Sequence, residues 1–158
     1  MKSVFAKAWP SQPTAATPQR RPVLLINLRE LEATRLLGVD VFTCAHHWVT
    51  DDSILDYLLR KEPHPRVKCK HDRNCRCNHA AVVAGMVFAM LNGRKFPPLY
   101  LRVHENRVRG AVSSIELIDG HHRLRARQFL RNTDNIRWAV KGDVALLRRT
   151  LVQARRER

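Results

Sequence analysis

The segment IELIDGHHRLRARQFL, residues 115–130, holds the densest group of residues suited to chemistry. Apolar residues run into Asp119 and Gly120, and five cationic or titratable residues follow within seven positions: His121, His122, Arg123, Arg125 and Arg127. The pattern predicts a strand that ends at the glycine and a helix that begins behind it. The first N–H groups of a helix lack intrahelical partners and carry partial positive charge, which favours an anion. We therefore predict a phosphate-binding site at this junction.

Three residues of the junction are suited to holding phosphate or a nucleotide. Gly120 allows the backbone to approach a phosphate closely, and Arg123 offers a bidentate guanidinium fork. Arg125 adds a second positive charge one turn from the glycine.

The same stretch contains candidate catalytic groups. His121 and His122 titrate near neutral pH and are candidates for acid–base work, with Arg123 stabilising charge on the phosphoryl group. Asp119 is placed to cap the helix, to hold a metal ion or to orient a water molecule. Glu116, on the expected strand, is an additional candidate.

Each of these assignments has a structural alternative. His122 precedes Ala126 by four residues and so shares the apolar face of the helix, where it would be a hydrogen-bonded packing residue. Arg125 and Arg127 would then form only a solvated helix face.

The net charge points to a polyanionic partner. The chain has 29 Lys and Arg against 14 Asp and Glu, a formal charge of +15. Such a field attracts DNA or RNA, and DNA is the expected partner. Anionic lipid, an acidic protein surface, or charge that serves only solubility are the alternatives.

The remaining composition bounds the class of protein. Hydrophobic residues make up 44% of 158 residues, enough for the core of one domain. No apolar run is long enough to span a membrane, and the first residues lack the apolar region of a secretory signal. We therefore predict a cytoplasmic protein whose four cysteines are reduced or metal-bound.

The Cys- and His-rich loop KCKHDRNCRCNH contains the possible metal ligands Cys69, Cys75, Cys77 and His79. Thiolate and imidazole are ligands that Zn²⁺ prefers, although this spacing is not that of two separated CxxC pairs. A reduced loop whose basic residues contact phosphates is the favoured alternative.

The order of expected elements predicts an α+β fold with a mixed sheet flanked by helices. Residues 1–21 read as a flexible, basic, Pro-containing arm, and residues 22–158 as a single domain with the Cys/His-rich loop at 61–78. Strands are expected at 23–26, 39–44, 99–103, 112–118 and 136–140. Helices are expected from residue 28 to Gly38, from Asp51, at 79–91, from Gly120 to about Leu130, and behind Asp143.

The last helix combines an apolar stripe with a basic surface. Its arginines Arg148, Arg149, Arg155 and Arg156 suit contact with a nucleic-acid backbone, which is salt-dependent and indifferent to base sequence. A solvated basic tail is the alternative.

The segment FPPLYLRVHENRVRGAVSSIELIDGHHRLRA resembles the ParB/sulfiredoxin superfamily, and the resemblance extends over about residues 79–131. The prolines at 97 and 98 correspond to the turn before the first strand of that motif. Gly120, His122, Arg123 and Ala126 correspond to its glycine-rich turn and helix start. The resemblance implies a small α+β nucleotide-binding fold that holds phosphates at this turn.

Departures from the family pattern narrow this implication. His121 stands where sulfiredoxin has its catalytic cysteine, so reduction of sulfinic acids is not expected. The helix expected at 79–91 is too apolar to supply the family's phosphate ligands, and the residues that remain are too few to fit the helix-turn-helix domain into which ParB continues.

The chain is most similar in organisation to single-domain members of the superfamily. These include plasmid-borne proteins of the Osa type, which inhibit conjugative DNA transfer and show ATPase and DNase activities. The resemblance thus implies a hydrolase (an ATPase, a nuclease or both) that uses ATP with Mg²⁺ and has a protein of the conjugation machinery as a possible partner. The alternatives are a non-catalytic effector that binds DNA or protein, and a zinc-stabilised nucleic-acid-binding module.

Overall fold

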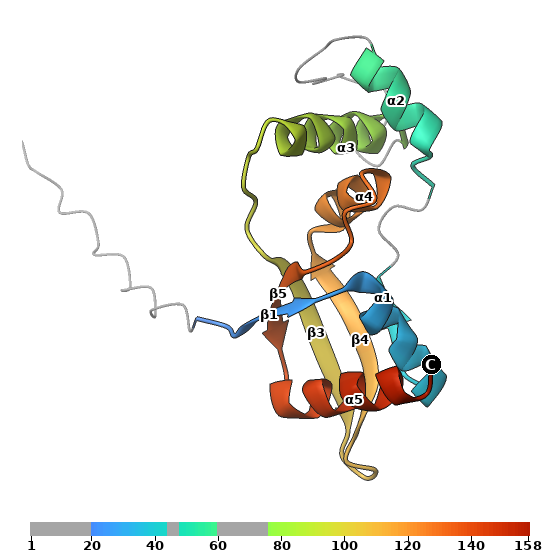
Figure 1. The fold of residues 1–158 in the computed structure, drawn as a ribbon, viewed down its shortest axis with the longest axis vertical. Helices are drawn as coiled ribbons and strands as arrows, with labels where there is room; N and C mark the ends of the chain where they lie inside the picture. The colour runs from blue at the N-terminus through green and yellow to red at the C-terminus, as the bar shows by residue number, and fades with distance from the viewer. Residues whose placement is uncertain (1–19, 44–47, 60–75) are drawn as a thin grey trace, which may run out of the picture.

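The computed structural model describes residues 20–43, 48–59 and 76–158, with side chains in the last range from residue 79 onward (Figure 1). These ranges contain a five-stranded mixed sheet and five α-helices, which confirms the predicted α+β class. In chain order the elements are β1 (Val23–Ile26), α1 (Leu28–Ala33), a 3-10 turn η1 (Thr34–Leu37), β2 (Asp40–Phe42), α2 (Asp51–Leu59), α3 (Arg76–Leu91), β3 (Leu99–Asn106), β4 (Ala111–Asp119), α4 (His121–Phe129), β5 (Ile136–Lys141) and α5 (Val144–Arg156).

The sheet has the strand order β1-β5-β3-β4-β2. β1 and β5 are antiparallel, as are β3 and β4, whereas β3 pairs in parallel with β5 and β2 with β4. It follows that β1, β2 and β4 run in the same direction and end at one edge of the sheet. Both α1 and α4 begin at that edge, directly behind β1 and β4.

One face of the sheet carries the main core. Alternate strand residues point to this face, among them the fully buried Leu101, Ile115 and Trp138. Helices α1 and α5 cover it (Figure 1), and Leu147 and Leu151 of α5 belong to the same cluster. The indole Nε1 of Trp138 donates a hydrogen bond of 2.9 Å to the carbonyl oxygen of Ile26, so this buried polar group is satisfied.

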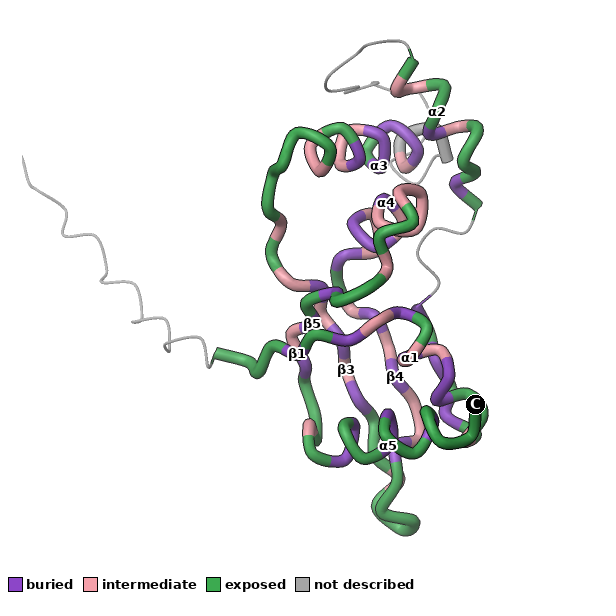
Figure 2. The backbone as a smooth tube through the Cα atoms, in the orientation of Figure 1, coloured by how far each residue is buried: buried purple, intermediate pink, exposed green. Residues whose placement is uncertain are grey.

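Helices α2, α3 and α4 pack around a second hydrophobic cluster at the sheet edge where β4 ends (Figure 1). Ile54, Val83, Val87 and Ala126 are buried in it. The nearly all-apolar sequence of residues 79–91 favours a buried helix, and the structure buries it only in part. Only one side of α3 faces α2 and α4, and its residues Val82, Phe88 and Leu91 are exposed (Figure 2).

Several helix ends follow the sequence signals. Oδ1 of Asp143 accepts a hydrogen bond of 2.8 Å from the Leu146 N–H and caps α5 as expected. Oγ1 of Thr50 accepts from the Ser53 N–H at 3.2 Å at the start of α2. Gly93, with a φ of +77°, lies in the left-handed region behind α3.

Two local expectations need correction. The strand expected at 99–103 is longer in the structure, where β3 continues to Asn106 because its polar end pairs with the start of β4. The Cys/His-rich loop was predicted to reach residue 78, but α3 already begins at Arg76. Of the predicted arm at 1–21, residues 1–19 lie outside the described part of the chain.

Across the described ranges, no helix has both the length and the apolar character needed to cross a bilayer.

Candidate functional site

The glycine of the β4–α4 junction is required by the fold itself. Gly120 has a φ of +101° and is the N-cap residue of α4. A Cβ on it would lie 2.5 Å from Cδ2 of Leu99 and 3.1 Å from Nη2 of Arg123. Backbone conformation and packing therefore account for the glycine without any ligand.

Arg123 is buried and fastens the junction to the segment that leads into β3. Its Nη1 donates hydrogen bonds to the carbonyl oxygens of Pro97 and Pro98 at 2.7 and 3.0 Å. Its Nη2 donates to Oδ2 of Asp119 at 2.9 Å. With only 10% of its side chain exposed, the guanidinium serves the structure, and its expected role as an open phosphate fork gains no support from the geometry.

Asp119 was expected at the helix cap, and this is wrong. No side chain caps α4, because the N-cap residue is Gly120 and the Asp119 carboxylate accepts from Arg123 instead. The carboxylate is nevertheless 75% exposed, so solvent and solutes can reach it.

His122 faces inward and contacts a second histidine. Its Nε2 lies 2.7 Å from Nδ1 of His79 in α3, and the two rings stack with centroids 5.0 Å apart. Burial, followed by repulsion from His79 and His121, lowers the pKa of His122 to about 4. His122 is thus neutral at pH 7 and has the geometry of the packing alternative, which leaves His121 as the better-placed acid–base candidate.

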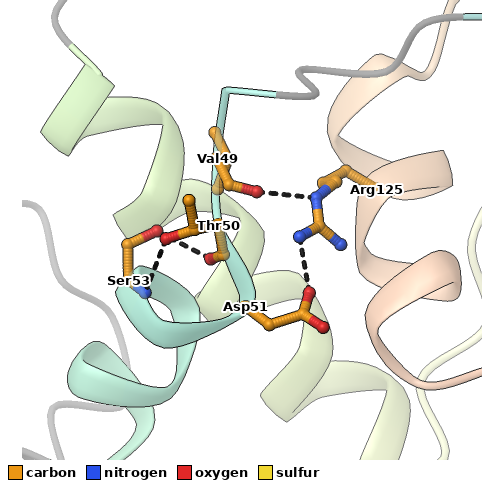
Figure 3. Close-up of polar contacts among 5 residues, drawn as sticks. All are labelled: Val49, Thr50, Asp51, Ser53 and Arg125. Carbon is orange, nitrogen blue, oxygen red and sulfur yellow. Dashed lines mark hydrogen bonds and ion pairs between the residues drawn. The ribbon is translucent and has the colours of Figure 1, made fainter.

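Arg125 joins α4 to the beginning of α2 (Figure 3). Its Nε donates to the carbonyl oxygen of Val49 at 2.8 Å, and its Nη2 lies 2.6 Å from Oδ1 of Asp51. Only 11% of the side chain is exposed, so the interpretation of Arg125 as part of a solvated face is wrong.

A pocket of about 610 Å³ lies between α1, α4 and the start of α2, at the edge where β2 and β4 end. We call it the arginine pocket, because four of its ten lining residues are arginines and only two are acidic. Its lining consists of Leu28, Arg29, Glu32, Arg35, Thr43, Asp51, Arg125, Gln128, Arg131 and Thr133.

The four arginines of this pocket differ in how far the fold uses them. Arg125 holds α2, and Nη2 of Arg35 donates to the carbonyl oxygen of Val41 at 2.9 Å. Arg29 and Arg131 are exposed residues, and within the described ranges their guanidinium groups form no ion pair with a carboxylate. These two side chains are the ones best able to receive an anion.

The arginine pocket and the histidine junction share one face of α4. His121, Arg125 and Gln128 follow at helical spacings of four and three residues, which places them in one row along the helix. Arg125 is therefore the predicted phosphate ligand that lies in the pocket. Sequence reasoning missed Arg29, Arg35 and Arg131: only the fold brings α1 and η1 to α4, and Arg131, two residues behind α4, had no signal of its own.

Glu116 belongs to a different surface. Its Oε2 lies 3.9 Å from Nη1 of Arg102 and 3.4 Å from Nε2 of His104, both on the neighbouring strand β3. Glu116 alternates with the core residues Ile115 and Leu117, so it points to the face of the sheet away from α1 and α5.

The arginines of α5 also divide into two groups. Arg148, Arg149 and Arg156 are exposed and line a groove of about 640 Å³. Nη2 of Arg155 instead lies 2.8 Å from Oε1 of Glu30 and fastens α5 to α1. Beyond the helix, Arg158 donates to the carbonyl oxygen of Arg29.

The proposed metal ligands fall mostly outside the described atoms. Cys69 and Cys75 lie outside the described residues, as does the side chain of Cys77. His79 contacts His122. The described residues contain no group of three or more His, Cys, Asp or Glu side chains suited to a metal ion, and the zinc hypothesis stays a prediction.

Comparison of the chain with protein-family models, curated proteins and solved structures gave no match. The similarity to the ParB/sulfiredoxin superfamily therefore stays a prediction from the sequence.

Proposed function

We propose that this protein binds nucleic acid, with DNA as the expected partner, and that the arginine pocket holds its phosphate groups. One observation carries the proposal: four guanidinium groups from two separate segments, α1 with η1 and α4 with the turn behind it, line a single pocket with only two carboxylates. A single basic stretch is often only a solvated surface. Convergence of Arg29, Arg35, Arg125 and Arg131 from different elements is harder to explain without an anion.

The chemistry of the lining suits a phosphodiester or polyphosphate. Guanidinium groups bind phosphate oxygens in a bidentate manner, and such charge-assisted hydrogen bonds are stronger than neutral ones. The hydroxyl-bearing residues Thr43 and Thr133 and the amide of Gln128 add polar groups to the same lining. The volume of about 610 Å³ is that of an ordinary small-molecule site and admits a nucleotide-sized group.

The overall charge supports the same partner. A formal charge of +15 attracts nucleic acid from solution, and the exposed arginines of α5 supply further backbone contacts. Interference with conjugative DNA transfer, and a protein partner in that machinery, rest on the family resemblance alone.

Phosphate-ester hydrolysis, of ATP or of DNA, is a second candidate function. The observation that favours it is the exposed carboxylate of Asp119 beside His121, at the start of the α4 row that continues into the pocket. In this proposal Asp119 holds Mg²⁺ or orients a water molecule, and His121 transfers the proton.

The binding proposal is tested with a fluorescein-labelled 20-nucleotide DNA, by anisotropy, on the double variant Arg29→Gln/Arg131→Gln. We expect Kd to rise by about tenfold or more, because two phosphate contacts are lost. The charge-matched control is Arg94→Gln/Lys95→Gln, whose residues are exposed and lie outside the pocket. Equal Kd values for the two double variants would contradict the proposal.

The hydrolysis candidate needs a separate assay. Phosphate release from ATP and nicking of plasmid DNA are measured with Mg²⁺ for the wild type, Asp119→Asn and His121→Ala. The candidate predicts activity in the wild type and a loss of at least about a hundredfold in either variant. Absence of activity in the wild type would remove hydrolysis and leave the binding proposal intact.

A further inference from the structure

The hairpin between β3 and β4 projects from the body of the molecule. Its tip, residues 107–110, extends past α5 at the bottom of Figure 1 and is exposed throughout (Figure 2). The residues next to the tip, His104, Glu105 and Ala111, are exposed as well. The hairpin end therefore covers no part of either hydrophobic cluster.

The tip places one apolar side chain between two cations. Val108 is 96% exposed, more than any other large apolar side chain in the described part of the chain. Arg107 and Arg109 flank it, and both are exposed. Neither arginine forms an ion pair with a carboxylate of the described residues. Packing within the protein thus does not explain an apolar side chain at position 108. A partner with a negatively charged rim and an apolar interior would explain it.

The turn is held in one conformation before any partner arrives. Oδ1 of Asn106 accepts hydrogen bonds from the N–H groups of Val108 and Arg109, at 3.1 and 3.3 Å. The Arg109 N–H also lies 3.2 Å from the carbonyl oxygen of Asn106. Gly110 supplies the left-handed residue with a φ of +57°. A fixed turn loses little entropy on binding, which favours its use as a contact.

The base of the hairpin stands beside the start of α5. A Cβ on Gly142 would lie 2.6 Å from the carbonyl oxygen of Val103, so the two backbones touch there. Beyond Val103 the strand continues to Asn106, which at about 3.3 Å per residue places the turn roughly 10 Å farther out. Val108 is therefore within reach of the same nucleic acid that contacts Arg148 and Arg149 of α5.

We propose that the hairpin tip inserts Val108 into a groove of duplex DNA and loosens one base step, while Arg107 and Arg109 contact the phosphates on either side. Proteins that bend duplex DNA use apolar wedges flanked by cations in this way. The inference rests on the proposed nucleic-acid binding and adds double-stranded DNA as the substrate class. A single strand has no groove to receive the wedge, and an anionic membrane would attract the arginines without needing a fixed turn.

The test uses a 20-base-pair duplex with 2-aminopurine, whose fluorescence rises when its base unstacks, placed in turn at successive positions. The wild type is compared with Val108→Ser, Arg107→Gln/Arg109→Gln and the control Leu91→Ala. Leu91 is an exposed apolar residue of α3, and this helix lies at the opposite end of the molecule from the hairpin tip (Figure 1). We expect a fluorescence rise at some position with the wild type and the control, and none with Val108→Ser. The duplex Kd should rise about tenfold in Val108→Ser, whereas the Kd for the labelled single strand should change less than twofold.

The possible outcomes distinguish failure of the Val108 insertion from failure of the proposed nucleic-acid binding. If the wild type binds the duplex but no position changes in fluorescence, or if Val108→Ser responds as the control does, insertion is wrong while DNA binding stands. If the wild type binds vesicles of phosphatidylserine and phosphatidylcholine through Val108 but binds no duplex, the partner is a membrane and the inference is overturned. If the wild type binds no nucleic acid at all, the proposed function and the inference fail together.

Discussion

Nε2 of His122 lies 2.7 Å from Nδ1 of His79, and this contact joins α4 to α3 inside the second hydrophobic cluster. The His122 ring is neutral near pH 7, because burial, followed by repulsion from His79 and His121, lowers its pKa to about 4. One nitrogen of the pair then donates to the other. His122 therefore forms a pH-sensitive structural contact between two helices, and it does not have the geometry expected of an acid–base residue.

Acidification should weaken the fold through this contact. As pH falls below about 6.5, His122 takes up a proton in the unfolded chain but not in the folded one until about pH 4. The free energy of unfolding should therefore decrease over that interval, by about 1–2 kcal/mol from this group once solvent screening is allowed for. Urea unfolding at pH 7.5, 5.5 and 4.5 measures the decrease.

The matched variants for this prediction are His122→Gln and His104→Gln. The first should show a shallower decrease than the wild type between pH 6.5 and 4, despite lower stability at pH 7.5. The second changes an exposed histidine of β3 and should keep the decrease. A slope in His122→Gln equal to that of the wild type would contradict the assignment.

Replacement of Arg123 should reduce stability more than it reduces any binding. Arg123→Ala removes three hydrogen bonds that fasten the start of α4 to Asp119 and to the carbonyls of Pro97 and Pro98. We expect a loss of about 2–3 kcal/mol in the free energy of unfolding. Arg123→Lys should recover less than half of it, since an ammonium group cannot match the fork. Normal stability of Arg123→Ala in urea unfolding would refute this role.

Two glycine-to-alanine changes should act in opposite directions. Gly120→Ala forces a Cβ against Leu99 at a φ of +101°, and should cost about 2 kcal/mol or more. Gly85→Ala lies within α3 with no atom in the way, and should stabilise by about 0.5–1 kcal/mol through helix propensity. Thermal unfolding of both variants measures these changes in stability. An unchanged stability of Gly120→Ala would contradict the close packing of Gly120 against Leu99.

Arg125 should affect both stability and phosphate binding, whereas Arg131 should affect only binding. Arg125→Ala breaks the contacts to Val49 and Asp51 and should lower the free energy of unfolding by about 1–2 kcal/mol. Arg131 is already a non-glycine residue with a positive backbone φ, and Arg131→Gln leaves this unchanged. The substitution also removes no ion pair with the described residues. Parallel urea unfolding and DNA titration separate the two roles. Equal effects of both variants in both assays would contradict the division.

The elements that carry strong local signals could be predicted from the sequence. The alternating apolar residues of β4, the glycine at 120 and the cap at Asp143 were correctly read, because each depends on neighbours a few residues away. The expected strand at 99–103 stops short of the polar end of β3, because that end is held in strand conformation by pairing with β4. The exposure of α3 was also missed, since composition alone does not reveal how many sides of a helix find partners.

The candidate site was predicted only in part. The sequence drew attention to α4 and named packing as the alternative for His122, but it assigned Arg123 to phosphate, whereas the fold uses its guanidinium. Arg29, Arg35 and Arg131 had no local signature. Their meeting depends on β1 and β4 ending at one edge of the sheet, and that is a property of strand order.

The most direct test of phosphate binding in the arginine pocket is the salt dependence of DNA affinity. Each phosphate contact releases counterions and adds about 0.9 to the slope of log K against log salt for duplex DNA. We expect Arg29→Gln/Arg131→Gln to lower the magnitude of that slope by about 2 relative to the wild type, with the circular dichroism spectrum unchanged. A slope equal to that of the wild type would contradict it, and the phosphate contacts would then lie elsewhere on the molecule.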